Sequence, residues 1–228
     1  ANLTIDLADT TAPTISSITA VATGALNGKL NGGDSISFSA EVDSVIKAGT
    51  SFNMLLDNGD TISMSTGVSN SNTLSGSLTL TDESIETDLL SVQSYTVVDA
   101  VDLSGNALVS DTAVANFDQV KDSSIKIDTT APGLYLNTFE ADGVTANLLT
   151  LKFTEAISNT SEVDAALRAL NIVDNSTSGT WSGSDTVFQI ETNEALTEDN
   201  NDLTLSLTFE DLAGNSVTLN EIEDFQII

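Results

Sequence analysis

Apolar and hydroxyl-bearing side chains alternate without a break in Leu203-Thr204-Leu205-Ser206-Leu207-Thr208-Phe209. In an extended strand successive side chains point to opposite faces, so this pattern places the apolar residues on one face and the hydroxyls on the other. The same alternation occurs at residues 35–39, 61–65, 77–81 and 149–153. Period-two alternation with Ser and Thr partners predicts half-buried antiparallel strands, and therefore an all-β fold.

Three segments between these strands carry other signals. Asp57-Asn58-Gly59-Asp60 contains the Asn-Gly pair that favours a tight hairpin turn, and its acids lack the alternate spacing of an EF-hand calcium loop. Residues 161–170 combine a capping serine with apolar residues at helical spacing, which predicts a short helix on the edge of the sheet. Residues 82–90 are a less regular candidate for a helix at the corresponding place in the first half of the chain.

Two signatures recur and reveal an internal repeat. Asp9-Thr10-Thr11-Ala12-Pro13 returns letter for letter at 128–132, and Asp102-Leu103-Ser104-Gly105-Asn106 returns as Asp211-Leu212-Ala213-Gly214-Asn215. We therefore expect one module at 9–118, a linker strand at 119–127 and a second module at 128–228, preceded by an N-terminal strand at 1–8. About seven short strands in roughly 100 residues, joined by turn signals, predict two tandem immunoglobulin-like β-sandwich modules.

The composition excludes several kinds of site and partner. The 228 residues include no Cys and no His, which excludes disulfides, thiolate or imidazole zinc sites and histidine-dependent triads. With 34 acidic and 6 basic residues the net charge is −28, which repels nucleic acid and anionic membranes. No apolar run is long enough to span a membrane, so we expect no membrane insertion. So acidic a surface is either adapted to salt or recruits hard cations, and Ca²⁺ suits carboxylate and carbonyl oxygens best.

The signatures resemble a known family when Phe153-Thr154-Glu155-Ala156-Ile157 is added to them. Together they resemble the bacterial immunoglobulin-like domains of S-layer proteins and large calcium-dependent adhesins, from Asp9 to the C-terminus. The resemblance implies a secreted, cell-surface protein, and the first residue, Ala1 rather than Met, agrees with removal of a signal peptide. The second module follows the family pattern, whereas the first holds its acid one residue late, in Phe38-Ser39-Ala40-Glu41.

The direction of the strands is expected to gather the acids of these signatures at one pole of each module. The first strand leaves from that pole, the second returns to it, and the penultimate strand arrives there. The second module contributes Asp128, Glu155, Asp211 and Asn215, and the first contributes Asp9, Glu41 or Asp43, Asp102 and Asn106. A Ca²⁺ ion with six to eight oxygen ligands would remove the repulsion between these carboxylates and stiffen the joint between modules.

The same residues also have a purely structural interpretation. Asp and Thr of the opening signature can bond the local backbone, and Pro enforces an extended entry into the module. Gly105 and Gly214 can supply positive φ, and Asn106 and Asn215 can bond the loop backbone. The sequence leaves both interpretations open.

The two ends of the chain complement each other. Asn106 and Asp128 are separated by 22 positions, and the same number results if the residues after Asn215 are continued into the N-terminus of another copy as far as Asp9. The apolar pattern of the linker is rebuilt as well, with Leu3, Ile5 and Leu7 following the C-terminal Ile228. Either the chain is a two-repeat slice of a longer array, or copies assemble head to tail, with residues 2–7 added as a strand to a neighbour's sheet edge.

These observations favour a non-catalytic structural protein of the cell surface that assembles with other copies of itself. The acids recur at equivalent places, whereas an active site normally occurs once, so we expect no enzyme. The alternative is a two-module fragment of a long adhesin, acting as a spacer or as a region that binds other surface proteins or glycans. Trp181, Tyr95 and Tyr135 are the only Trp and Tyr residues available for a sugar platform, and we expect each in the core or on a strand surface.

Overall fold

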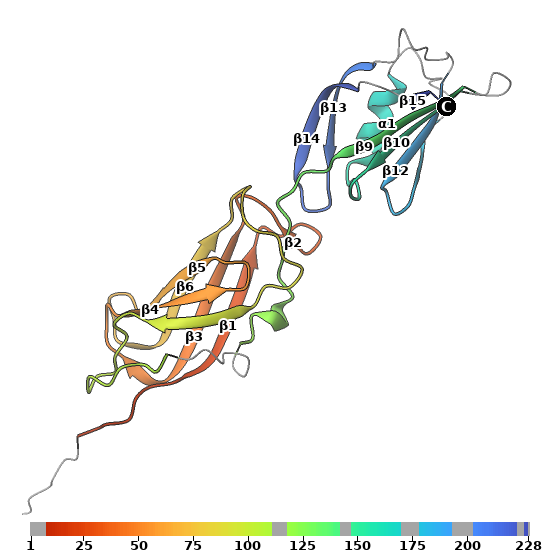
Figure 1. Ribbon diagram of the computed structural model, residues 1–228. Coiled ribbons are helices and arrows are strands. Elements are labelled where there is room, and N and C mark those ends of the chain that lie inside the picture. Colours follow the sequence, from red (N-terminus) through yellow and green to blue (C-terminus); the bar gives the residue numbers. More distant parts are fainter. Residues whose placement is uncertain are drawn as a thin grey trace, which may run out of the picture. The chain divides into compact units, whose positions relative to one another are not determined.

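The computed structural model describes residues 8–110, 118–141, 147–169, 178–192, 203–222 and 226–227. It is mostly β, with sheets in a sandwich-like arrangement, so the prediction of an all-β fold is confirmed. The chain divides into two compact units, Ala1–Thr129 (the first unit) and Thr130–Ile228 (the second unit) (Figure 1).

The main sheet of the first unit follows the order β1-β3-β6-β5-β4-β7. Its strands are β1 (Ile15–Thr23), β3 (Ser35–Ile46), β4 (Ser51–Leu56), β5 (Thr61–Ser65), β6 (Ser71–Thr79) and β7 (Val92–Val97). β5 and β6 share only the Ser65↔Ser75 pairing, so the sheet turns there and places β1, β3 and β6 in one layer and β5, β4 and β7 in the other. The apolar residues of the alternating stretches, such as Phe38 and Met64, are buried between the layers.

The expected strands and hairpin are present. The predicted strands at 35–39, 61–65 and 77–81 fall in β3, β5 and β6, although β6 ends at Thr79. The hairpin at 57–60 joins β4 to β5, with the Leu56 N–H donating to the Asp60 carbonyl at 2.8 Å.

Residues 82–90 form turns, so the expectation of a helix there is wrong. The Thr87 and Leu90 N–H groups donate to the carbonyls of Ile127 and Ile125, and are therefore not available for helical bonds.

Residues 118–129, which follow the main sheet in the sequence, pack into the first unit. After η2 (Lys121–Ser123), β8 (Lys126–Ile127) pairs in parallel with β2 (Lys29–Leu30). Val120, Ile125 and Ile127 belong to the first unit's core and are 0%, 5% and 2% exposed. The buried Asp118 carboxylate accepts the N–H groups of Val92 and Val120, and Thr129 Oγ1 donates to the Ser84 carbonyl. The segment expected to be a linker strand is therefore the closing strand of the first unit.

The second unit repeats part of the pairing of the first. Its larger sheet has the order β11-β12-β10-β9-β15, and a second sheet pairs β13 with β14. The strands are β9 (Leu134–Ala141), β10 (Asn147–Phe153), β11 (Thr180–Ser182), β12 (Val187–Thr192), β13 (Leu203–Glu210), β14 (Ser216–Ile222) and β15 (Gln226–Ile227). Ile15↔Val42 and Thr19↔Ser39 in β1–β3 correspond to Leu134↔Phe153 and Thr138↔Thr150 in β9–β10, with a register shift at the same step. The repeated sequence signatures are thus accompanied by the same strand register in β1–β3 and β9–β10.

The predicted helix is α1 (Thr160–Arg168), which begins one residue before the expected range. Val163 and Leu167 lie one turn apart and are fully buried, while Asp164 and Arg168 form an ion pair on another face. Asn159 precedes the helix, but its side chain does not cap the helix end. It binds β13 instead: Nδ2 donates to the Thr208 carbonyl and Oδ1 accepts the Glu210 N–H. It thereby satisfies backbone groups on the edge of β13. Within the described residues, no helix has the length and apolar character needed to cross a membrane.

Candidate functional site

The loop 102–106 of the first unit is closed around the Asp102 carboxylate. Oδ1 accepts the backbone N–H groups of Ser104 and Asn106 at 2.9 and 2.8 Å, and Oδ2 accepts the Asn106 side-chain amide at 2.9 Å. Gly105 has φ +92°, a conformation that glycine adopts without strain. Asp102 is only 3% exposed, so water solvates little of its carboxylate. The hydrogen-bond donors of the loop stabilise the charge instead.

These donors lower the pKa of Asp102 below its ordinary value of 3.8. The largest cause is the side-chain hydrogen bond from Asn106, and the backbone N–H groups of Asn106, Ser104 and Gly105 add to it. Burial acts in the opposite direction and is outweighed. The loop therefore favours the charged form of Asp102.

The loop 211–215 of the second unit has the same geometry. Asp211 Oδ1 accepts the N–H groups of Ala213 and Asn215, both at 2.8 Å, and Oδ2 accepts the Asn215 side-chain amide at 2.8 Å. Gly214 has φ +91°, and Asp211 is fully buried. In both loops the glycine has the positive φ that the structural interpretation expected. Each Asn side chain donates to the Asp carboxylate, where that interpretation expected a bond to the loop backbone.

Glu155 joins Asp211 within the second unit. Ile157 forms an isolated bridge with Asp211, which brings the segment after β10 beside the loop. A carboxylate oxygen of Glu155 lies within 4.8 Å of one from Asp211. Two charges at that separation repel by roughly 3 kcal/mol at an effective dielectric constant of about 20. A cation between the two carboxylates would convert this repulsion into attraction.

Asp211 retains limited capacity for such a cation. A carboxylate offers about four lone-pair directions, and three are used by the loop. The remaining direction is on Oδ2. Asp211 can therefore act as a monodentate ligand without opening its loop, and further oxygen ligands must come from other residues or water.

The corresponding position in the first unit holds Ser44. Ile46 bridges to Asp102 as Ile157 bridges to Asp211, and Ser44 precedes Ile46 by two residues, as Glu155 precedes Ile157. Asp43, next to Ser44, accepts the N–H and the hydroxyl of Thr14, both at 2.8 Å. Its carboxylate thus ties the entry of the first unit to the end of β3.

The other expected ligands of the first unit lie apart or bond locally. Glu41 is in β3, paired with Ser17 and Thr73, and its Oε1 accepts the Thr73 hydroxyl at 2.8 Å. Asp9 Oδ1 accepts the Thr11 N–H, and the Asp9 carbonyl accepts the Asn106 side-chain amide at 3.1 Å. Within the described part of the first unit, Asp9, Glu41 and Asp102 do not converge as a group of three carboxylates.

Asp128 has a cationic partner that the sequence pattern did not indicate. It forms an ion pair with Lys29, whose side chain is 31% exposed against 14% for Asp128. Its N–H donates to the Leu30 carbonyl at 2.9 Å, which continues the β2–β8 ladder. Lys29 is separated from Asp128 by 99 positions, and only the parallel β2–β8 pairing brings them together.

The Trp and Tyr residues lie in the core or on a strand surface, as expected. Trp181 is half-buried and packs against Phe153 and Phe188, with ring centroids 5.8 and 5.0 Å apart. Tyr95 is buried and its hydroxyl donates to the Val109 carbonyl, while Tyr135 is exposed on β9. Leu3, Ile5 and Leu7, the expected assembly residues, lie outside the described residues.

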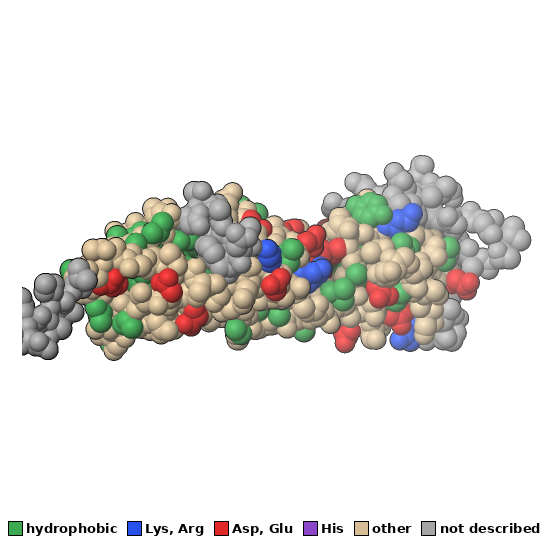
Figure 2. Space-filling view, turned by 90° about the horizontal axis from the view of Figure 1, so that it is seen from below, with side chains coloured by type: hydrophobic (Ala, Val, Ile, Leu, Met, Phe, Trp, Pro, Cys, Tyr) green, Lys and Arg blue, Asp and Glu red, His purple; other side chains and the backbone are tan. Residues whose placement is uncertain are grey.

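Acidic side chains are spread widely over the face of the molecule seen in Figure 2, with few cations among them.

Comparison with models of known protein families gives no match, and no curated protein matches the sequence.

Proposed function

We propose that this protein is a non-catalytic structural component of an extracellular bacterial surface. Its two immunoglobulin-like modules act as rigid units, and copies join head to tail when the N-terminal strand of one chain adds to the second module of the next. The observation that carries this proposal is the packing of residues 118–129 as the closing strand of the first unit.

The closing strand indicates which contacts stabilise a module when an added segment packs against it: core burial and backbone hydrogen bonds. Ile125 and Ile127 are buried in the core, and backbone bonds join the segment to Leu30, Thr87 and Leu90. The N-terminal segment of another copy offers the same alternation through Leu3, Ile5 and Leu7. Each buried aliphatic side chain contributes about 1.5–3 kcal/mol, against an association cost of about 4–15 kcal/mol. Edge hydrogen bonds and a further contact at the pole are therefore needed for a stable junction.

Electron microscopy and light scattering of the full chain test the assembly. Replacing Leu3, Ile5 and Leu7 together by Asp should abolish filaments, because the apolar side of the strand is lost. The control replaces the alternate residues Thr4 and Asp6 by Ser and Asn, which leaves that side unchanged. Filaments that survive the triple substitution would disprove strand addition. A wild-type protein that stays monomeric at all concentrations would instead favour a spacer in a longer adhesin.

We further propose that Ca²⁺ binds at the N-terminal pole of the second module, with Asp128, Glu155 and Asp211 as carboxylate ligands. The neighbouring carboxylates of Glu155 and Asp211 support this site. Chain connectivity supports the third ligand: Gly133 is tied to Thr154 by two hydrogen bonds, and Asp128 is only five residues earlier, a reach of at most about 18 Å. Asn215 holds Asp211 in position. In the first module, Asp9, Asp102 and Asn106 form a weaker Ca²⁺ site, because Ser44 stands at the position that Glu155 has in the second module.

Calorimetric titration with Ca²⁺ and thermal unfolding in Ca²⁺ or chelator test the site. We expect a dissociation constant in the weak extracellular range, about 10⁻⁴–10⁻³ M. Glu155→Gln should weaken binding at least tenfold, whereas Asp43→Asn, which changes a carboxylate occupied by Thr14, should leave it unchanged. A melting temperature that is the same in millimolar Ca²⁺ and in chelator would refute the calcium proposal while leaving strand addition intact.

A further inference from the structure

Two exposed apolar side chains are neighbours at the end of the first unit where the chain enters it. An antiparallel bridge joins Ile46 to Asp102. The residues one step beyond it, Val45 and Leu103, are therefore cross-strand neighbours. The bridged pair is buried, whereas Val45 and Leu103 are 44% and 61% exposed. We call Val45 and Leu103 the entry patch.

The chain enters the first unit along the loop that carries Leu103. The Pro13 carbonyl accepts the Val109 N–H at 3.3 Å. The Asp9 carbonyl accepts the Asn106 side-chain amide at 3.1 Å. The two stretches therefore lie side by side and run in the same direction. Followed backward past Asp9, the chain arrives at the loop that holds Leu103.

The segment ahead of Asp9 is apolar and close to the entry patch. Residues 1–7 lie outside the described residues, and they carry three aliphatic side chains at alternate positions, the last of which is Leu7. The Cα atoms of Leu7 and Asp9 are at most about 7 Å apart, because each residue extends the chain by no more than about 3.6 Å. The whole segment spans at most about 25 Å. Leu7 therefore has Leu103 within its reach.

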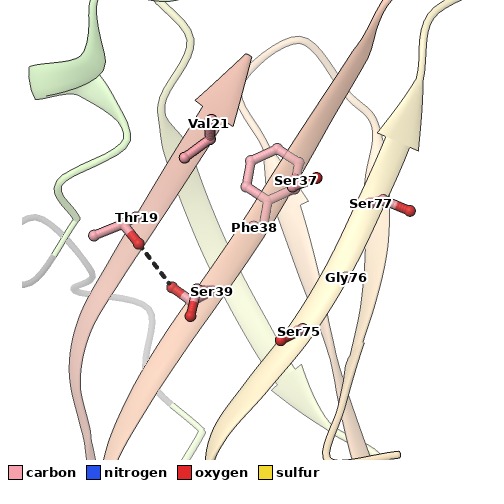
Figure 3. Close-up of a pocket in the computed structure, with 8 residues that line it drawn as sticks. All are labelled: Thr19, Val21, Ser37, Phe38, Ser39, Ser75, Gly76 and Ser77. Carbon is pink, nitrogen blue, oxygen red and sulfur yellow. Dashed lines mark hydrogen bonds between the residues drawn. The ribbon is translucent and has the colours of Figure 1, made fainter. Parts of the chain in front are cut away.

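The length of the segment excludes two other exposed apolar side chains of the first unit. The hollow shown in Figure 3 lies among serines and threonines of β1, β3 and β6, and Val21 beside them is 66% exposed. Val21 pairs with Ser37, nine residues along β3 from Ile46, which corresponds to about 30 Å at the rise of a strand. Leu26 lies further still, in the loop before β3 begins. Both are beyond the reach of residues 1–7.

Two exposed valines lie at the same end of the first unit as the entry patch. Val68 and Val98 are 98% and 59% exposed. Their surroundings are small or polar: the Gly67 carbonyl accepts the Gly49 N–H, and the Val98 N–H donates to the Ser51 carbonyl. A single valine offers less apolar area than the neighbouring pair of the entry patch. Val68 and Val98 are therefore suitable control positions.

The second unit has a smaller apolar pair at the equivalent place. The residues that correspond to Val45 and Leu103 are Ala156 and Leu212, which flank the equivalent bridge. Leu212 is 38% exposed. The segment ahead of the second unit is the closing strand, whose apolar side chains are buried in the core of the first unit. The larger apolar pair thus belongs to the unit that follows residues 1–7.

We propose that the entry patch is the docking site of residues 1–7 of the same chain, with Leu7 packed against Leu103 and Val45. A short tether gives a local concentration in the millimolar range, so a contact with a dissociation constant of about 1 mM between separate molecules is about half occupied. At about 1 µM protein, the same segment of a second copy is roughly a thousandfold more dilute. The chain's own segment is therefore the favoured occupant.

Docking places the entry patch in competition with strand addition. A docked segment is not available to the second module of a neighbour, so assembly has to displace it first. The population that is competent to assemble falls by the docked fraction. Docking itself is independent of the proposed function, whereas this control of assembly rests on it.

The first experiment measures docking in the unassembled chain. Asp6→Cys with Ser104→Cys places one thiol in the N-terminal segment and one beside Leu103, in a chain without other Cys. Ser104 is exposed, and its N–H rather than its side chain bonds Asp102, so the substitution leaves the loop intact. The rate of the intramolecular disulfide, measured at about 1 µM in a thiol–disulfide buffer, reports how closely the segment stays to the loop.

The thiol pair is compared in three backgrounds. These are the otherwise unchanged chain, Val45→Ser with Leu103→Ser, and the control Val68→Ser with Val98→Ser. We expect the disulfide to form at least fivefold more slowly without the entry patch, and at the unchanged rate in the control. Equal rates in all three backgrounds overturn the proposal. A disulfide-linked dimer as the main product also overturns it, because the occupant would then be a second copy.

Light scattering of the same substitutions without the cysteines tests the control of assembly. Val45→Ser with Leu103→Ser should assemble about twofold faster than the wild type, because a docked fraction of about one half is released. Val68→Ser with Val98→Ser should assemble like the wild type. Equal assembly rates in all three proteins would overturn the control of assembly by docking. A wild type that never assembles would instead refute the head-to-tail proposal, and the disulfide rates still decide whether the segment docks.

Discussion

The side-chain amide of Asn215 donates to Asp211 Oδ2 at 2.8 Å, across the loop that the two residues begin and end. The Asn215 N–H completes the ring by donating to Oδ1, and the Asp211 N–H donates back to the Asn215 carbonyl at 3.0 Å. Asp102 and Asn106 repeat the same relationship in the first unit. The repeated Asp and Asn are therefore a loop-closing device in both units, and any metal ligation by Asp211 is added to that role.

Asn215→Ala should destabilise the second unit by roughly 1–3 kcal/mol, because the buried Asp211 Oδ2 loses its donor. Trp181 is the only Trp and lies in the second unit, so its fluorescence during urea unfolding reports that unit alone. Asn106→Ala is the matched control, since it changes the equivalent bond in the first unit. An unchanged Trp181 transition in Asn215→Ala would contradict the assigned role.

The stability of the first unit should depend on pH through Asp102. Its pKa is lowered in the folded state, so the unfolded chain binds the proton more readily. The stabilisation is present above the unfolded pKa, near 3.8, and is lost as the pH falls through the lower folded value. Asn106→Ala removes the largest cause of the shift, so wild type and variant should differ at neutral pH and converge in strong acid. Circular dichroism between pH 2 and pH 7 measures this, and a difference that grows in acid would reverse the assigned sign.

Much of the fold follows from local pattern, whereas the site depends on contacts that no local pattern encodes. Alternation located the strands, and the register repeat between β1–β3 and β9–β10 accompanies the repeated signatures. Matching the sequence around Phe38 to that around Phe153 assigned Glu41 as the counterpart of Glu155. The strand register instead aligns Val42 with Phe153, so Ser44 stands at the position of Glu155. The pairing of β2 with β8 was also missed, because Lys29–Leu30 lies in a Gly- and Asn-rich stretch without strand periodicity. Such pairings are decided by tertiary packing.

Lys29→Met should strengthen Ca²⁺ binding several-fold if Asp128 is a ligand. The ammonium group now shares the Asp128 carboxylate that the metal would use. The pair is partly exposed and worth at most about 1 kcal/mol, so the first unit should unfold at nearly the same urea concentration. Calorimetric titration provides the affinity. Lys47→Met, which removes the same charge elsewhere in the first unit, is the control, and equal affinities for the two variants would remove Asp128 from the ligand set.

Ile127→Ala should destabilise the first unit by about 2–4 kcal/mol, because Ile127 is 2% exposed within that unit's core. Far-ultraviolet circular dichroism should show an earlier transition for part of the signal, while the Trp181 transition of the second unit stays in place. Lys126→Ala changes the exposed neighbour in β8 and should have little effect. If both variants unfold like the wild type, residues 118–129 are a passive connection instead of a closing strand.

Gly76→Ala should weaken the bend where the first unit's sheet passes from one layer to the other. A Cβ at Gly76 would lie 2.7 Å from the Ser63 carbonyl oxygen and 2.8 Å from both Ile62 Cγ2 and Met64 Sδ. The carbonyl belongs to the β5 backbone and cannot rotate aside, so β5 and β6 must separate at the place where they share a single pairing. Overpacking of this kind costs about 1–3 kcal/mol.

The control is Ser77→Ala, next to Gly76 on the outward side of β6, which leaves the bend unchanged and should unfold like the wild type. Since β5 and β6 hold the two layers together, Gly76→Ala should also expose core amides of both strands to hydrogen exchange, and unchanged protection would show that the close approach is not needed to join the layers.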